Sequence, residues 1–142
     1  MDELATLIRL AKHALDEKRK VMSALEEQAA KVEAEKAGLL ALLEQERQRS
    51  PDALEGGLTQ GAFIRTSYQK RDKLDMRLAE LARQMAAVQD EIRAAFEELK
   101  RYEIAAEQRA RAETREEKRR EVKELDEIGG ELKRRRGESS QS

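Results

Sequence analysis

Apolar residues recur at a seven-residue spacing through the first third of the chain. Counted in sevens from Ile8, the a and d positions hold Met1, Leu4, Ile8, Ala11, Leu15, Lys18, Met22, Leu25, Ala29, Val32, Lys36, Leu39, Leu43 and Glu46. A heptad repeat sustained over so many turns is typical of a coiled coil, and only Lys18, Lys36 and Glu46 interrupt this first heptad line. The pattern predicts one helix over about residues 3–49.

The repeat stops at a segment that contains helix-breaking residues. Pro51 disfavours the helical conformation in the residue before it and has no backbone N–H to donate. Three glycines, Gly56, Gly57 and Gly61, follow the proline, and glycine clusters of this kind mark turns. We therefore predict a turn over about residues 50–61.

A second heptad line begins after the turn. Its a and d positions hold Ile64, Ser67, Arg71, Leu74, Leu78, Leu81, Met85, Val88, Ile92, Ala95, Leu99, Tyr102 and Ala106. The block from Leu74 to Ala106 has no charged interruption. A second helix is therefore predicted over about residues 62–128.

The last part of that helix has no apolar line to pack with. Beyond Ala106 the expected apolar positions are held by Arg109, Glu113, Glu116 and Arg120. The segment still consists of strong helix formers. A short apolar set then reappears out of register, formed by Val122, Leu125 and Ile128. Gly129 and Gly130 are predicted to end the helix, and residues 131–142 to form a disordered polar tail.

Pairing the two heptad lines predicts an all-α antiparallel coiled-coil hairpin over residues 1–130. If the chain folds back at the turn, facing residue numbers add to about 110, which sets Leu15 against Ala95. Several such layers join a large side chain to a small one, as interdigitated cores prefer. A slip by one heptad, which places Glu46 near Arg71, is the alternative. In either register the second helix is longer and extends beyond the start of the first.

Two lysines on the first heptad line, Lys18 and Lys36, leave two interpretations open. Their aliphatic stems can cover the helix interface while the ammonium groups reach water. Alternatively, the two side chains fix the register or contact a partner.

The composition agrees with long helices and narrows the function. Charged residues make up 42% of the 142 residues and aromatic residues 3%, which is typical of coiled coils and not of globular domains. A formal net charge of -1 argues against bulk binding to nucleic acid or lipid. The absence of cysteine fits a reducing compartment. No signal peptide pattern is recognised, and no apolar run approaches the about 20 residues that a membrane span requires. We expect a soluble cytoplasmic protein without direct membrane insertion.

No catalytic, cofactor-binding or metal-binding pattern stands out. The single histidine, His13, falls at an outward heptad position, and the many carboxylates fit a solvated helix face. Neither a glycine-rich phosphate loop nor an HExxH motif is present. We therefore expect a protein that is not an enzyme and has no cofactor or metal.

Several features of the layout occur together: two heptad helices, a glycine-containing turn, the stretch EQRARAETREEKRREVKELDEI and a polar tail. The individual residues that weigh most are Tyr102, Glu103, Arg109, Arg111, Glu116, Leu125, Asp126 and Glu127. Over essentially the whole chain this layout resembles the FliJ family of flagellar export proteins.

The resemblance implies a non-enzymatic component of the bacterial flagellar type III export apparatus, peripherally associated with the inner face of the cell membrane at the flagellar base. Such a protein acts as a stalk that docks into and stimulates the hexameric export ATPase. It also engages the membrane export gate protein and export chaperones, and it is expected to be a monomer when free.

The residues expected to dock into the ATPase lie on the projecting end of the second helix. They are Arg109, Arg111, Arg115, Arg119, Arg120, Val122, Leu125 and Ile128. An apolar patch without a partner in its own chain suggests that this end binds another protein. A prefoldin-like holdase and a structural coiled-coil tether are the alternatives, and both predict stable oligomers.

Overall fold

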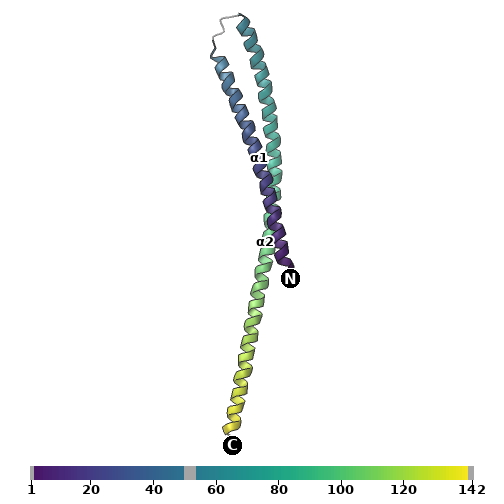
Figure 1. Ribbon diagram of the computed structural model, residues 1–142, viewed down its shortest axis with the longest axis vertical. Helices are drawn as coiled ribbons and strands as arrows, with labels where there is room; N and C mark the ends of the chain where they lie inside the picture. Colours follow the sequence, from purple (N-terminus) through teal and green to yellow (C-terminus); the bar gives the residue numbers. More distant parts are fainter. Residues whose placement is uncertain (1, 50–53, 141–142) are drawn as a thin grey trace. The chain divides into compact units, whose positions relative to one another are not determined.

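The computed structural model describes residues 2–49 and 54–140. These ranges contain two helices, α1 (Glu3–Arg47) and α2 (Leu54–Ser140), and no strand (Figure 1). The predicted all-α class is therefore confirmed. As predicted, the second helix is the longer one, with 87 residues against 45. Neither helix has a stretch in its described residues that is long and apolar enough to cross a membrane.

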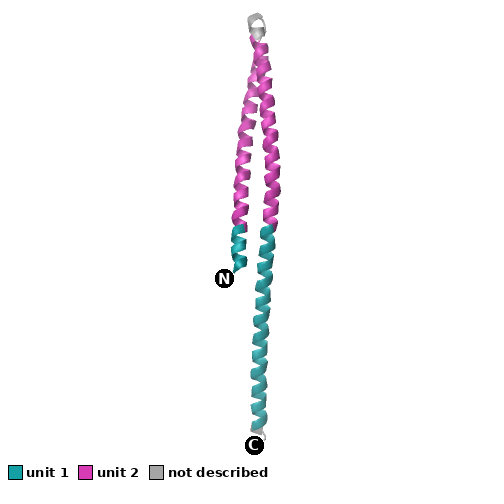
Figure 2. Ribbon diagram, turned by 90° about the vertical axis from the view of Figure 1, so that its right-hand side faces the viewer, with its two compact units in different colours: residues 1–10, 98–142 teal, residues 11–97 magenta. Residues whose placement is uncertain are grey.

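The chain divides into two compact units, coloured separately in Figure 2. The central unit comprises Ala11–Glu97, and the terminal unit comprises Met1–Leu10 with Glu98–Ser142. Both helices cross from one unit into the other, so each unit contains one segment of α1 and one segment of α2.

In the central unit the two helices lie side by side in opposite directions, and two ion pairs define their register. Lys18 Nζ lies 3.4 Å from Glu91 Oε2, and Lys36 Nζ lies 2.7 Å from Asp75 Oδ1. Both pairs fit the register in which facing residue numbers add to about 110. A slip by one heptad would set Lys36 against Ala82, which has no carboxylate, and Lys18 against Glu98, which has one, so the Lys36 pair distinguishes the two registers. The contacts agree with the first of the two predicted registers.

Burial in the central unit follows the two heptad lines. Every residue of α1 from position 11 to position 46 that is not exposed occupies an a or d position. In α2, every a and d position from 64 to 95 is buried or half-buried, and Leu81 is fully buried. Since most of these buried and half-buried positions carry apolar side chains, the apolar area removed from water is the main contribution that stabilises the helix pair.

The structure supports parts of both interpretations of Lys18 and Lys36 that the sequence left open, namely covering the interface and fixing the register. Lys18 and Lys36 are half-buried, so their stems cover part of the interface. Their ammonium groups bind carboxylates of the other helix, and the Lys36 bond is specific to one register. We conclude that Lys36 contributes to register as well as to packing, whereas Lys18 contributes to packing and to the cross-helix contact.

In the terminal unit, the first residues of α1 pack against the adjoining part of α2. The Asp2 carboxylate accepts a hydrogen bond from the Leu4 N–H at 3.2 Å, which caps the helix start. The same carboxylate lies 3.4 Å from the Arg109 guanidinium. Leu4 and Ile8 are half-buried, and Leu99 on α2 is buried. The residue numbers of the Asp2–Arg109 pair add to 111, so this contact fits the same register of about 110.

The predicted turn over residues 50–61 was too long, because α2 begins at Leu54. Residues 50–53 lie outside the described residues, and the predicted end of the first helix at 49 shifts to Arg47. A hydrogen bond of Gln60 helps to explain why the helix begins before the predicted end of the turn. The Gln60 side-chain amide donates to the Glu46 carbonyl at 2.6 Å. Carbonyls in the last turn of a helix have no intrahelical partner, so this bond stabilises the end of α1 and the start of α2 together.

The predicted end of the second helix at residue 128 was wrong as well. Helix α2 continues through Gly129 and Gly130 to Ser140, so residues 131–140 of the predicted disordered tail are helical, while 141 and 142 lie outside the described part. A glycine inside a helix costs only about 1 kcal/mol relative to alanine. Neighbouring helix formers offset this cost, and Arg135 also pairs with Glu131 one turn earlier.

Candidate docking segment of helix α2

The candidate site is the docking segment, which we define as residues 109–138 of α2 in the terminal unit. Every residue of this segment is exposed except Gly130, which is half-buried. All eight residues predicted to dock into a partner lie on it. The structure therefore places these residues on one helix and leaves their side chains accessible to a partner.

The arginines of the docking segment are held mainly by acids of their own helix. Arg111 pairs with Glu107, while Arg119 and Arg120 both lie near Glu116, at 4.0 and 3.9 Å. Exposed ion pairs of this kind contribute between nothing and about 1 kcal/mol, because water screens them and the long side chains lose rotamer freedom. The guanidinium groups can thus exchange these acids for those of a partner at little cost.

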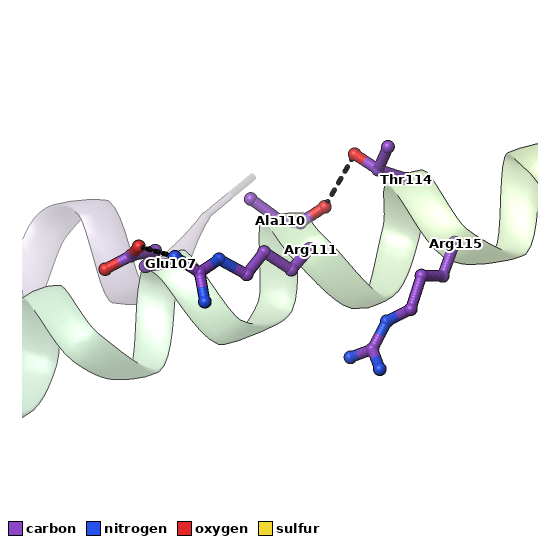
Figure 3. Close-up of a pocket in the computed structure, with 5 residues that line it drawn as sticks. All are labelled: Glu107, Ala110, Arg111, Thr114 and Arg115. Carbon is purple, nitrogen blue, oxygen red and sulfur yellow. Dashed lines mark hydrogen bonds and ion pairs between the residues drawn. The ribbon is translucent and has the colours of Figure 1, made fainter.

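Figure 3 shows the part of the docking segment around Arg111 and Arg115, together with Glu107 just before it. Glu107, Ala110, Arg111, Thr114 and Arg115 line a shallow, open depression. The Thr114 hydroxyl donates to the Ala110 carbonyl at 2.9 Å, so its proton is already used in a bond within the helix. Arg111 reaches toward Glu107, whereas Arg115 forms no bond to another residue drawn there. Arg115 is consequently the arginine most available to an external carboxylate in this part of the segment.

The apolar residues of the docking segment form an apolar stripe that no described residue covers. Its members and their exposed fractions are Val122 at 57%, Leu125 at 67%, Ile128 at 54% and Leu132 at 53%. Three of the four were predicted from the sequence. Leu132 was missed because the helix was expected to end at residue 128, although it follows Leu125 by one full heptad.

A second accessible site, a groove of about 580 Å³, lies in the central unit. It is lined by Glu35, Gly38, Leu39 and Leu42 of α1 and by Lys70, Lys73 and Leu74 of α2. The sequence did not indicate this groove, because Leu42 falls beside the first heptad line and not on it. Leu42 is 54% exposed, and the two lysines give one side of the groove a positive charge.

Two titratable groups outside the docking segment, Tyr102 and Glu80, have pKa values shifted from their ordinary ones. The Tyr102 hydroxyl donates to the Glu98 carboxylate at 2.9 Å, and this bond raises the pKa of Tyr102. Hydrogen bonds from Arg83 and Gln84 lower the pKa of Glu80. Both groups pair with residues one turn away on the same helix. The described residues include no group of three or more His, Cys, Asp or Glu side chains that could hold a metal ion.

Comparisons of the chain with models of protein families, with curated proteins and with solved structures found no match.

Proposed function

We propose that this chain is a non-enzymatic component of the flagellar type III protein export apparatus, in which the docking segment enters and stimulates a hexameric export ATPase. The observation that supports this proposal is the docking segment itself, a helix exposed along residues 109–138 that combines arginines with an apolar stripe. The resemblance to the FliJ family supplies the class of partner. Within that proposal, the chain also engages the export gate and export chaperones from the cytoplasmic face of the membrane.

The central unit acts in this proposal as a stiff support of antiparallel coiled-coil type. Burial at heptad spacing on both helices and the cross-helix pairs of Lys18 and Lys36 support that type of packing. A stalk requires such stiffness, because a load applied to a flexible element would be lost in bending.

The test is ATP hydrolysis by the cognate export ATPase in the presence of the double variant Arg111→Glu, Arg115→Glu. Both side chains are exposed, and neither has an ion pair with α1 in the described part of the chain, so helicity and melting temperature should stay unchanged. Stimulation should be lost, because the reversed charges would repel the acids of the ATPase that the arginines are proposed to bind.

The matched control is Arg83→Glu, Arg93→Glu in the central unit. These arginines are similarly exposed and pair with acids three residues earlier, Glu80 and Asp90. This control makes the same change in net charge and should leave stimulation intact. Undiminished stimulation by the Arg111 and Arg115 variant, or equal loss in the control, would contradict the assignment of the docking segment.

A second candidate function, a holdase for unfolded proteins, is favoured by the groove in the central unit. Leu39, Leu42 and Leu74 offer apolar surface there without a covering element among the described residues. A holdase would lose client binding with Leu42→Glu and would tolerate charge reversal at Arg111 and Arg115. Suppression of the aggregation of an unfolded test protein by these variants separates the two candidates.

A further inference from the structure

The apolar stripe continues a heptad pattern of its own, separate from the second heptad line. If Val122 is set at an a position, Leu125 falls at d, Gly129 at the next a and Leu132 at the next d. All three large residues are more than half exposed. The helix also keeps a glycine at the one position of this set without an apolar side chain. An added Cβ at Gly129 would meet nothing within 4 Å in the chain, so the space beside it is open.

This pattern is complementary to itself when two copies run antiparallel. Val122 then faces Leu132 of the second copy, and Leu125 faces Gly129 of the second copy. The two-fold axis repeats both contacts, as in any isologous interface. Ile128, which lies just before Gly129, meets Ile128 of the second copy beside the axis. The layers join larger side chains to smaller ones, and the glycine lets the helices approach closely.

The charges on one flank favour the antiparallel arrangement. Glu121 and Arg135 each precede an a position, and positions of that kind face each other across an antiparallel helix pair. Glu121 therefore meets Arg135 of the second copy, twice by symmetry. A parallel pair would instead bring Glu121 of one copy next to Asp126 of the other, and these two acids repel. Arg135 pairs with Glu131 at 3.4 Å on its own helix, and an exposed pair of this kind is readily exchanged.

The charges on the other flank limit the strength of the same arrangement. Asp126 follows a d position and meets Asp126 of the second copy close to the two-fold axis. Arg119 and Lys133, which also follow d positions, meet each other. Arg119 lies near Glu116 of its own helix at 4.0 Å, which partly offsets its charge. This flank therefore opposes a contact that the apolar stripe and the first flank favour.

We propose that the apolar stripe binds the same stripe of a second copy of this chain, forming a symmetric antiparallel dimer. The contact is short, and interfaces below about 1,000 Å² are weak, so the chain is a monomer when dilute and a dimer when concentrated. This inference goes beyond the proposed function and does not rest on it. It also has a consequence for that function, because a stripe occupied by a second copy cannot enter another protein.

The first test is sedimentation equilibrium of the purified full chain over a range of concentrations. Glu121→Arg and Arg135→Glu each turn two attractive contacts into repulsive ones, and each should weaken dimerisation about tenfold. The double variant Glu121→Arg, Arg135→Glu restores opposite charges and should dimerise like the wild type. Asp126→Asn removes the repulsion at the axis and should strengthen the dimer, whereas Leu125→Glu should abolish it. Circular dichroism confirms that each variant keeps its helicity.

The second test uses disulfide formation, which is simple to interpret because the chain has no cysteine. An equal mixture of the Val122→Cys and Leu132→Cys proteins should give disulfide-linked dimers on mild oxidation, because these positions face each other. Neither protein alone should do so, since its two cysteines would stand about 15 Å apart along the helix axis, beyond the reach of a disulfide. Efficient cross-linking by either protein alone would indicate a parallel pair and overturn the proposal.

Other outcomes would also overturn it. A wild-type chain that stays monomeric up to about 1 mM has no dimer of useful strength. Single charge variants that dimerise as well as the wild type would show that another surface is used. Because no ATPase is present in either experiment, these outcomes are independent of whether the docking segment stimulates one.

Discussion

Two stretches of α2 have the same backbone conformation and very different surroundings. Residues 78–97 in the central unit carry an apolar side chain at each a and d position of the heptad repeat, and Leu81 has no exposed surface. The docking segment, residues 109–138, is exposed at every position except Gly130. The first stretch is stabilised by packing against α1, whereas the second depends on helix propensity and on pairs such as Arg111 with Glu107. The same helix can therefore serve as core in one stretch and as binding surface in the other.

The largest expected effect is that of an acid in the packed stretch. Leu81→Asp would bury a carboxylate without a partner and should cost several kcal/mol, about 3 to 5. We expect a large fall in the melting temperature followed by circular dichroism. Met76→Asp is the control, since Met76 is 72% exposed, and it should melt nearly as the wild type does. Equal melting of the two variants would mean that the second heptad line does not form the core.

A proline in the docking segment should disturb only its own surroundings. Lys118→Pro removes a backbone hydrogen bond and should cost about 3 kcal/mol of local helix stability. Hydrogen exchange should quicken around residue 118, while the melting of the packed stretch stays unchanged. Lys118→Ala should leave both signals as they are. A fall in melting temperature comparable to that of Leu81→Asp would show that the two stretches depend on each other.

The packed stretch could be predicted from the sequence almost completely. Side-chain burial in a helix pair depends mainly on spacing, so counting in sevens located every residue of α1 between positions 11 and 46 that is not exposed. For the register the sequence offered two alternatives one heptad apart, and the layers that combine large with small residues favoured the one that the Lys36 ion pair fits. The acids that bind Lys18 and Lys36 were not predicted, since Glu91 and Asp75 lie beside the second heptad line and not on it.

The helix ends were predicted poorly because the rules for glycine and proline are local. Gly61, Gly129 and Gly130 each lie within α2, and no described glycine has a positive φ. A single glycine lowers helix stability slightly but does not forbid a helix whose neighbours are good helix formers. The Gln60 bond to the Glu46 carbonyl connects residues that are distant in sequence, and no local rule includes it.

The candidate site was predicted only in part, because heptad spacing reveals exposure along one helix but not helix ends or surfaces made by two helices. A helix that lacks an apolar line has nothing to pack with, so exposure of the five predicted arginines followed from the charged residues at the a and d positions beyond Ala106. Leu132 was lost with the wrong helix end. The groove beside Leu39 and Leu42 depends on side chains from both helices together with the open space at Gly38, and a count along one helix does not show it.

A smaller effect should distinguish a half-buried ion pair from an exposed one. Asp75→Asn removes the charge that faces Lys36, whose side chain is 29% exposed, and should lower the free energy of unfolding by about 0.5 to 1 kcal/mol. Glu116→Gln in the docking segment removes a partner of Arg119 and Arg120 and should change it by no more than a few tenths. Urea unfolding of both variants measures the difference. Equal losses would mean that burial at Lys36 adds nothing to the pair.

The smallest expected effect concerns Tyr102, the single aromatic residue of the second heptad line. The bond from its hydroxyl to Glu98 raises the pKa of Tyr102 above its ordinary value of 10.0, because an ionised phenolate would lose the bond and repel the carboxylate. A raised pKa in the folded state means that this stabilisation is complete below the unfolded pKa. It is lost as the pH rises through the folded value.

Ultraviolet absorbance of the phenolate, measured in a Tyr68→Phe background that leaves Tyr102 as the single tyrosine, follows this titration directly. Glu98→Gln should move the midpoint back toward lower pH, because the amide still accepts the bond but no longer repels the phenolate. The docking segment contains no tyrosine, so any such change reports on the paired part of the terminal unit alone. The same midpoint with and without the Glu98→Gln substitution would contradict this prediction. It would mean that the Glu98 carboxylate does not act on the Tyr102 hydroxyl in solution.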